Sequence, residues 1–292
     1  MKGNTQNKWN IRAWLFVIPS VILIIAFVFY PMIQAFITSF QTGMVDNLSF
    51  GGIANYKRLL TDSTFKKALF NTILFLIVQV PIMIFLALIV SSMLNNKKLK
   101  FRGLFRTAIF LPCVTSLVAY SIIFKSLFAN DGFINGVLMN FHIVSEPINW
   151  LTETTFARLL IIIAITWRWT GYNMIFYLSG LQSIDDSIYE AASIDGATGS
   201  QKFRYMTLPL LKPIILFTTI NSTIGTLQLF DEPMNITQGG PANTTITISQ
   251  YIYNLLFKYQ PNFGYAAAVS FVVVILIVIL SFIQLKVGDR NE

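Results

Sequence analysis

Charge, cysteine and histidine are all scarce in this sequence of 292 residues. Charged residues make up 12% of the chain, where soluble domains have about 25%. Hydrophobic residues make up 54%, and the mean hydropathy is +0.63. This composition excludes an ordinary soluble protein and predicts an integral membrane protein.

The scarcity of reactive side chains also limits the kinds of site that the chain can hold. The only cysteine, Cys113, cannot form an intrachain disulfide, and it lies in an apolar run where a packing role is the simplest interpretation. The only histidine, His142, is expected in an external loop, solvated and without a catalytic partner. No metal-ligand spacing, carboxylate pair or nucleophile with a neighbouring base is apparent, so we expect no metal site and no enzyme.

The net charge of +8 raises the question of a nucleic-acid partner. The Lys and Arg residues lie between and beside apolar runs and do not gather on one helix face. Such a distribution is typical of a chain oriented in a lipid bilayer, where cations flank the spans. We therefore expect contact with membrane lipid and none with nucleic acid.

Six apolar runs are each long enough to cross a hydrocarbon core about 30 Å thick, which needs about 20 helical residues. They cover residues 14–40, 70–94, 104–127, 157–180, 210–230 and 265–286. The first run exceeds the apolar core of a signal peptide and lacks a cleavage pattern, so we interpret it as an uncleaved span. We expect it to bend near Pro19 or to end near Pro31.

The cations set the expected direction of these spans. If the N-terminus is inside, thirteen Lys and Arg residues fall in inner segments and seven in outer segments, with Arg168 left within a span. The inner cations are Lys2, Lys8, Arg12, Lys97, Lys98, Lys100, Arg102, Arg106, Lys202, Arg204, Lys212, Lys286 and Arg290. The positive-inside rule therefore predicts that both termini are cytoplasmic, and it places residues 181–209 inside.

This inner segment, residues 181–209, interrupts the apolar chain with small and polar residues. Asp185 and Asp186 can cap a short helix, and the small residues after Glu190 favour its continuation. Gly196 and Gly199 then break it. A second short helix can start at Thr198 or Ser200 and run toward Pro209. The segment is predicted to be a helix-turn-helix projection that fits a cleft of another protein, although a plain connecting loop would have similar features.

The fourth span contains a charge that must be accommodated. An Arg in mid-span costs about 2.5 to 3.5 kcal/mol on insertion scales, so Arg168 should face the bundle interior, a partner or a water-filled cavity. Trp169, Tyr172 and Asn173 follow it, and aromatic faces beside hydrogen-bonding groups suit a sugar. An interfacial aromatic belt with an Arg reaching toward water is the alternative interpretation.

The segment from Glu190 to Pro209 supports identification of a family. It reads EAASIDG, nine further residues, then Met206 and TLP, which resembles the EAA-x3-G-x9-I-x-LP motif of binding-protein-dependent ABC transporter permeases, with Met206 at the Ile position. Four further stretches are similar to the carbohydrate-importing subclass, in particular to the first-permease component for maltose, lactose or glycerol-phosphate. They are FRTAIFLPCVTSLVAYSIIFKSLF, WRWTGYNMIFYLSGLQSI, LFDEPMNITQGGPANTT and FGYAAAVSF.

The resemblance implies a fold and a set of site residues. The fold is all-α and integral to the membrane: one permease domain over residues 1–292, with six transmembrane helices and a cytoplasmic EAA-type coupling helix pair at 181–209. The coupling residues would be Glu190, Ala191, Ala192, Asp195, Gly196, Ala197, Gly199, Leu208 and Pro209. The resemblance would place Arg168, Tyr172, Ser222, Gly225 and Thr226 on the substrate path, and the aromatic and hydrogen-bonding character of their neighbours adds Trp169, Asn173 and Gln228. The family has a small apolar-lined patch where this chain has Arg168 and Trp169, which leaves the substrate open.

The resemblance also implies the partners. A second, homologous permease would complete the path as a heterodimer, and two cytoplasmic ATPase subunits would bind ATP and Mg, because this chain has no phosphate-cradling motif. An extracellular or periplasmic sugar-binding protein would deliver the cargo to this bacterial cell-membrane assembly, at an outer surface that includes residues 231–245. Glycerol-phosphate is an alternative substrate, since Arg168 could face a phosphate. An ion-coupled secondary transporter is a further alternative, and it would need paired intramembrane ionisable groups.

Overall fold

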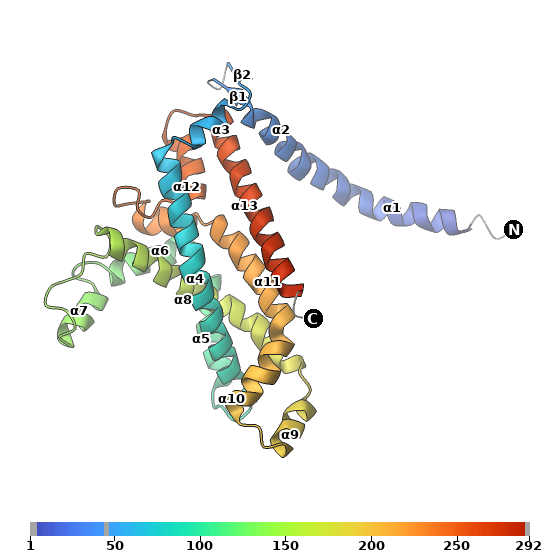
Figure 1. Ribbon diagram of the computed structural model, residues 1–292, viewed down its shortest axis with the longest axis vertical. Coiled ribbons are helices and arrows are strands. Elements are labelled where there is room, and N and C mark those ends of the chain that lie inside the picture. The colour runs from blue at the N-terminus through green and yellow to red at the C-terminus, as the bar shows by residue number, and fades with distance from the viewer. Residues whose placement is uncertain (1–4, 44–46, 290–292) are drawn as a thin grey trace. The chain divides into compact units, whose positions relative to one another are not determined.

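The computed structural model describes residues 5–43 and 47–289, and almost all of its regular structure is helical (Figure 1). Lys2 and Arg290, which entered the charge count, lie outside the described residues, as do the side chains of Lys8 and Arg12. The elements are α1 (Thr5–Ile24), π-helical η1 (Ile25–Phe29), α2 (Tyr30–Ser39), β1 (Gln41–Thr42), β2 (Ser49–Phe50), α3 (Ala54–Leu59), α4 (Ser63–Asn95), α5 (Arg102–Val114), α6 (Leu117–Leu127), α7 (Phe133–Asn140), α8 (Thr154–Ser183), α9 (Asp186–Ile194), α10 (Gly199–Lys202), π-helical η2 (Phe203–Thr207), α11 (Leu208–Leu227), π-helical η3 (Pro233–Thr237), α12 (Ile248–Tyr253), π-helical η4 (Asn254–Lys258) and α13 (Phe263–Asp289).

Five of the six predicted spans correspond to helices long and apolar enough to cross a membrane. These helices cover Ala13–Ser39, Ser63–Asn95, Thr154–Ser183, Gly199–Leu227 and Phe263–Gly288. The first does not end near Pro31, as one expectation had it, but continues to Ser39. Pro31 has no backbone N–H to donate, and the π-helical turn η1 just before it lets the helix continue past this residue. Single π-helical turns are a known cause of local irregularity in long helices.

The predicted span over 104–127 is not one straight helix. It forms α5 and α6, which are bent by 102° at residues Thr115 and Ser116. Pro112 lies in the last turn of α5 and cannot donate a backbone hydrogen bond there. The Thr115 hydroxyl donates to the Pro112 carbonyl at 2.8 Å, so a side chain takes the place of one backbone hydrogen bond where the helix is interrupted. Hydropathy measures only the apolar length of such a run, which is why it did not reveal the bend.

The chain divides into two compact units. The first comprises residues 1–61 and 252–272, and it includes the antiparallel pair β1–β2 with Gln41 opposite Phe50. Asn55 organises it by donating to the Ser39 and Gln41 carbonyls at 2.9 and 2.8 Å. Gly264 is required at the start of α13, since a Cβ there would lie 2.0 Å from the Gln41 carbonyl oxygen.

The second unit comprises residues 62–251 and 273–292, and it contains both candidate sites described below. Its centre is the long contact between α4 and α8, with α5 packed against α8 and α11 against both. Small residues permit this close packing, as is usual between membrane helices. A Cβ on Gly171 of α8 would lie 2.1 Å from the Ile109 carbonyl oxygen of α5. The expectation of one permease domain over the whole chain stays a prediction.

Candidate functional site

The first candidate site is the coupling hairpin, which we define as residues 185–209. Asp185 is the N-cap of α9 and accepts a hydrogen bond from the Ser187 backbone N–H at 2.9 Å. This hydrogen bond lowers the pKa of the Asp185 carboxyl below its ordinary value. After α9 the chain turns at Gly196, whose φ is +76°. Thr198 then starts α10 with a reciprocal capping box involving Gln201. Of the two predicted caps, Thr198 is therefore the one used.

The second helix of the hairpin is not a separate short element. From Gly199 it runs through α10 and η2 directly into α11, so it is the extended end of a membrane helix. Pro209 stands in the first turn of α11, directly after the π-helical turn η2, where its missing N–H is tolerated. Any force applied to the hairpin therefore reaches α11 without passing through a flexible connector.

Contacts inside the hairpin hold its two arms together. The Tyr189 and Thr207 hydroxyls are 2.9 Å apart and join α9 to η2. The Lys202 ammonium donates to the Ser193 hydroxyl, which is a second link between the arms. Ala192, predicted to lie on the docking surface, is only 1% exposed and therefore buried within the chain. Leu208 likewise packs inward, against the cluster around Leu211.

The other predicted coupling residues lie at the surface of the hairpin. Glu190, Ala191, Asp195, Gly196, Gly199 and Pro209 are exposed, and Ala197 is half-buried. A hollow of about 290 Å³ lies at the bend, lined by Asp195, Gly196, Ala197, Gln201, Tyr205 and Met206. Ile194 is 87% exposed beside it, an apolar side chain in water that the sequence reading did not single out.

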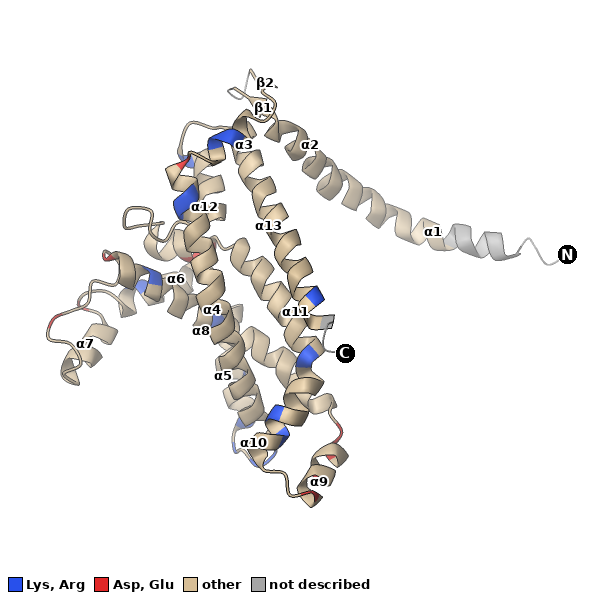
Figure 2. Cartoon of the chain, in the orientation of Figure 1, with Lys and Arg blue, Asp and Glu red and all other residues tan. Residues whose placement is uncertain are grey.

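Basic residues gather at the same end of the second unit as the hairpin (Figure 2). The link between α4 and α5 is basic, and its Lys97 ammonium lies 2.6 Å from the carboxylate of Asp186 in the hairpin. Both side chains are largely exposed, so this ion pair adds little stability, but it places the link beside the hairpin. Lys202 and Arg204 add further cations within the hairpin itself.

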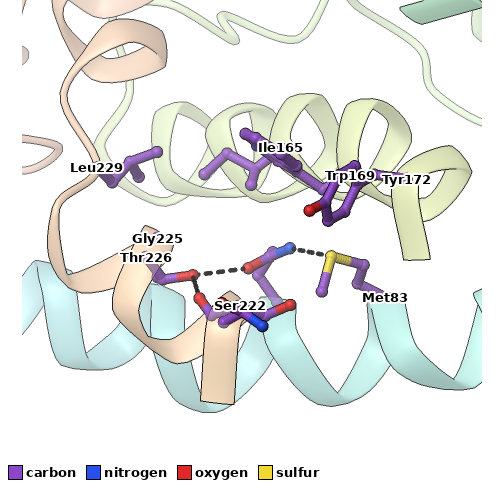
Figure 3. Close-up of a pocket in the computed structure, with 10 residues that line it drawn as sticks. Met83, Ile165, Trp169, Tyr172, Ser222, Gly225, Thr226 and Leu229 are labelled. Carbon is purple, nitrogen blue, oxygen red and sulfur yellow. Dashed lines mark hydrogen bonds between the residues drawn. The ribbon is translucent and has the colours of Figure 1, made fainter. Parts of the chain in front are cut away.

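The second candidate site is a cavity of about 220 Å³ between α4, α8 and α11 (Figure 3). Its lining residues are Gln79, Met83, Ile165, Trp169, Tyr172, Asn221, Ser222, Gly225, Thr226 and Leu229. Among the described residues that line it, none is charged. The Thr226 hydroxyl donates to the Ser222 carbonyl at 2.8 Å and lies 3.4 Å from Gln79 Oε1. A Cβ on Gly225 would meet nothing within 4 Å, so this glycine leaves the cavity open.

The structure brings five of the eight predicted path residues to this cavity: Trp169, Tyr172, Ser222, Gly225 and Thr226. The other three predicted residues, Arg168, Asn173 and Gln228, do not line it. Asn173 is buried and donates to the Trp169 carbonyl at 3.1 Å, while Gln228 is exposed at the end of α11.

Arg168 faces the bundle interior, as predicted, and its side chain forms an ion pair with Glu232, with Nη1 3.2 Å from Oε1. Glu232 belongs to residues 231–245, which the resemblance assigns to an outer surface, and its pairing with Arg168 was not predicted because 64 residues separate the two in sequence. Glu232 is 2% exposed although it lies beyond α11. Burial raises the pKa of its carboxyl, and the Arg168 guanidinium opposes that rise.

Sequence reading also missed half of the cavity lining. Gln79 was the one detectable member, because a lone amide in the apolar run IVQVP of α4 calls for a partner or a polar space. The sequence does not distinguish an apolar residue that lines a cavity from one that packs in the core, so it could not assign Met83, Ile165 and Leu229 to the cavity. Asn221, in α11, was not assigned to the path either.

Comparison with known proteins agrees with the architecture. Residues 95–291 match the family model for the binding-protein-dependent transport system inner membrane component. The lactose transport system permease protein LacF of Rhizobium radiobacter is 56% identical over 293 residues, covering 100% of this chain and 98% of that protein. The trehalose/maltose transport system permease protein MalF of Thermococcus litoralis is 30% identical, covering 99% of this chain and 98% of that protein. A chain in the crystal structure of a bacterial alginate ABC transporter, in complex with its alginate pentasaccharide-bound periplasmic protein, has the same fold, with a TM-score of 0.81, 24% identity and coverage of 98% and 96%.

Proposed function

Since the chain belongs to the family of binding-protein-dependent transport system inner membrane components, we propose that it is the permease subunit of an ATP-driven importer for neutral sugars. It forms half of the translocation path and couples to cytoplasmic ATPases through the coupling hairpin. The chain itself catalyses no reaction. Relatives named for a substrate include permeases of transport systems for lactose, arabinooligosaccharides, multiple sugars, and trehalose and maltose, which supports a sugar as cargo.

The observation that carries the proposal is the uncharged cavity beside α8. Trp169 and Tyr172 offer aromatic surface to the C–H faces of a sugar ring, while Gln79, Asn221 and Ser222 offer donors and acceptors to its hydroxyls. Ligand sites generally combine an apolar lining with a few such polar groups. A charged substrate would lose its hydration here without an opposite charge in return. Neutral sugars therefore fit this lining better than glycerol-phosphate does.

The coupling hairpin is proposed to seat in a cleft of the ATPase. Its exposed residues include the small Ala191, Gly196 and Gly199, so another backbone can approach closely there, and its second arm is continuous with α11. Closure of two ATPase subunits around ATP and Mg would thereby move α11, one wall of the cavity. A second, homologous permease would supply the other half of the path, and an extracellular or periplasmic binding protein would deliver the sugar.

The proposed orientation places the hairpin and both termini in the cytoplasm of a bacterial cell. The cations clustered at the hairpin end support this direction, because basic loops are retained on the inner side. On the opposite side, the loop after η3 is held firmly to the membrane helices. Asn71 donates to the Asn243 and Ile246 carbonyls at 3.1 and 2.9 Å, and Arg158 donates to the Thr244 carbonyl at 2.9 Å. This ordered outer loop is the proposed contact surface for the binding protein.

An uptake experiment tests the function. The chain would be reconstituted in liposomes with a homologous second permease, an ABC ATPase and a sugar-binding protein, and radiolabelled sugars would be added outside. We expect uptake of at least one of lactose, maltose, trehalose or an arabino-oligosaccharide, only with ATP inside and unaffected by a protonophore. Uptake driven by a proton gradient without ATP would support an ion-coupled carrier instead. Preferential uptake of glycerol-phosphate would contradict a neutral cargo.

A further inference from the structure

A buried ion pair joins two walls of the cavity. Arg168 belongs to α8, and Glu232 lies between the end of α11 and the start of η3. Their side chains are 11% and 3% exposed, so both charges are almost fully removed from solvent. Charges at such depth persist only when they are paired, and loss of one partner leaves the other uncompensated.

The pair stands at the margin of the cavity and not in its lining. On α8 the lining residues Ile165, Trp169 and Tyr172 share one helix face, and at about 100° per residue Arg168 lies roughly 65° from the centre of that face. Across the cavity, Leu229 lines the opposite wall three residues before Glu232. The ion pair therefore connects the α8 wall directly to the wall formed by the end of α11.

Aromatic rings close off this pair from one side. The Arg168 guanidinium carbon lies 5.8 Å from the Tyr120 ring centroid and 5.3 Å from that of Trp169. Tyr120 belongs to α6, is 2% exposed and stacks on Trp167 at 5.8 Å. The helix α6 also packs against η3. Three segments, α6, α8 and the start of η3, thus meet around one pair of opposite charges.

From this geometry we propose that Arg168 and Glu232 form a latch that holds the α8 wall and the α11 wall of the cavity together, and that this latch must open when the cavity admits or releases its substrate. Arg168 is then a positioning residue that does not contact the sugar. The apolar surroundings strengthen the attraction while the walls touch, and separation of the walls exposes both charges to water. The latch gives the joined arrangement of the two walls a discrete state. Its role in transport rests on the proposed import function.

Thiol labelling can measure opening of the latch without any substrate. Cys113 is the only cysteine, so Cys113→Ser gives a background into which Thr226→Cys is introduced as a reporter. Thr226 lines the cavity and is 5% exposed, so its thiol should react slowly with a membrane-impermeant maleimide. The assembled transporter in liposomes would be compared with Arg168→Gln, Glu232→Gln, the double neutral variant and the charge-exchanged variant R168E/E232R. Asp231→Asn is the matched control, since Asp231 is half-buried and forms no ion pair within the described part of the chain.

We expect labelling about tenfold faster in the double neutral variant, R168Q/E232Q, because without the ion pair the two walls separate more often. This variant should still fold, because neither charge is left buried without its partner. Labelling should return to the slow rate in the charge-exchanged variant and stay slow in Asp231→Asn. The single variants should label fast if they reach the membrane. Slow labelling of the double neutral variant, or fast labelling of the charge-exchanged variant, would overturn the latch. Failure of sugar uptake would contradict the proposed function alone, because the labelling rates need no sugar.

Discussion

Replacing Gly196 with valine should abolish ATP-driven sugar uptake while the chain still inserts into the membrane. Gly196 forms the bend between α9 and α10 with φ at +76°, a conformation that costs an L-residue about 1 to 2 kcal/mol and a β-branched residue more. A Cβ there would meet nothing within 4 Å, so the conflict is in the backbone and not in packing. The arms of the hairpin would turn differently, and the new side chain would occupy the hollow at the bend.

Gly136→Ala is the control for this substitution. Gly136 lies within α7 and outside both candidate sites, its Cβ position is also open, and it needs no left-handed backbone. Alanine favours a helix over glycine by about 1 kcal/mol, so uptake should be unchanged. Uptake, membrane content and co-purification of the ATPase would be measured for both variants. Normal uptake with Gly196→Val would rule out the coupling role of the bend.

Replacing Gly171 with alanine should destabilise the whole helical bundle. A Cβ at this position of α8 would lie 2.1 Å from the Ile109 carbonyl oxygen and 3.0 Å from the Phe110 Cα, both backbone atoms of α5. Backbone cannot rotate away, so the two helices must separate, and overpacking of this kind costs about 1 to 3 kcal/mol or more. We expect a clearly lower midpoint of thermal unfolding in detergent and less protein in the membrane.

Gly180→Ala in the same helix is the comparison for that result. Its Cβ would lie 2.4 Å from Ile214 Cδ1 and 2.7 Å from Leu211 Cδ2, which are side-chain ends that can change rotamer. The unfolding midpoint should fall by less than with Gly171→Ala. Equal effects of the two substitutions would mean that backbone proximity between α5 and α8 is not what limits stability.

Hydropathy and motif spacing predicted much of this architecture because both depend on local sequence. The length of an apolar run determines whether it can span a bilayer, and five of the six runs form such helices. The bend at Gly196 and the cap at Asp185 were also predictable, because glycine and N-cap preferences act over a few residues. The family was identifiable for the same reason, from the segment Glu190–Pro209.

The features that were missed depend on distant contacts. The 102° bend between α5 and α6 leaves the apolar composition of the run unchanged. Glu232 looked like a loop residue until the fold brought it to Arg168. Ala192 has the same small side chain whether it is exposed to a partner or buried in its own chain, and only the fold shows that it is buried. Sequence periodicity does not determine which residues from different helices meet.

The most direct test of the central proposal is the accessibility of the coupling hairpin. Ala197→Cys in the Cys113→Ser background places one thiol beside the bend, on a half-buried residue that lines the hollow. A membrane-impermeant maleimide would be applied to intact cells and to inside-out vesicles, with and without the ATPase. The proposal predicts labelling only in inside-out vesicles, and protection of the thiol when the ATPase is bound. Labelling of intact cells from outside would contradict it, because no cytoplasmic ATPase could reach the hairpin there.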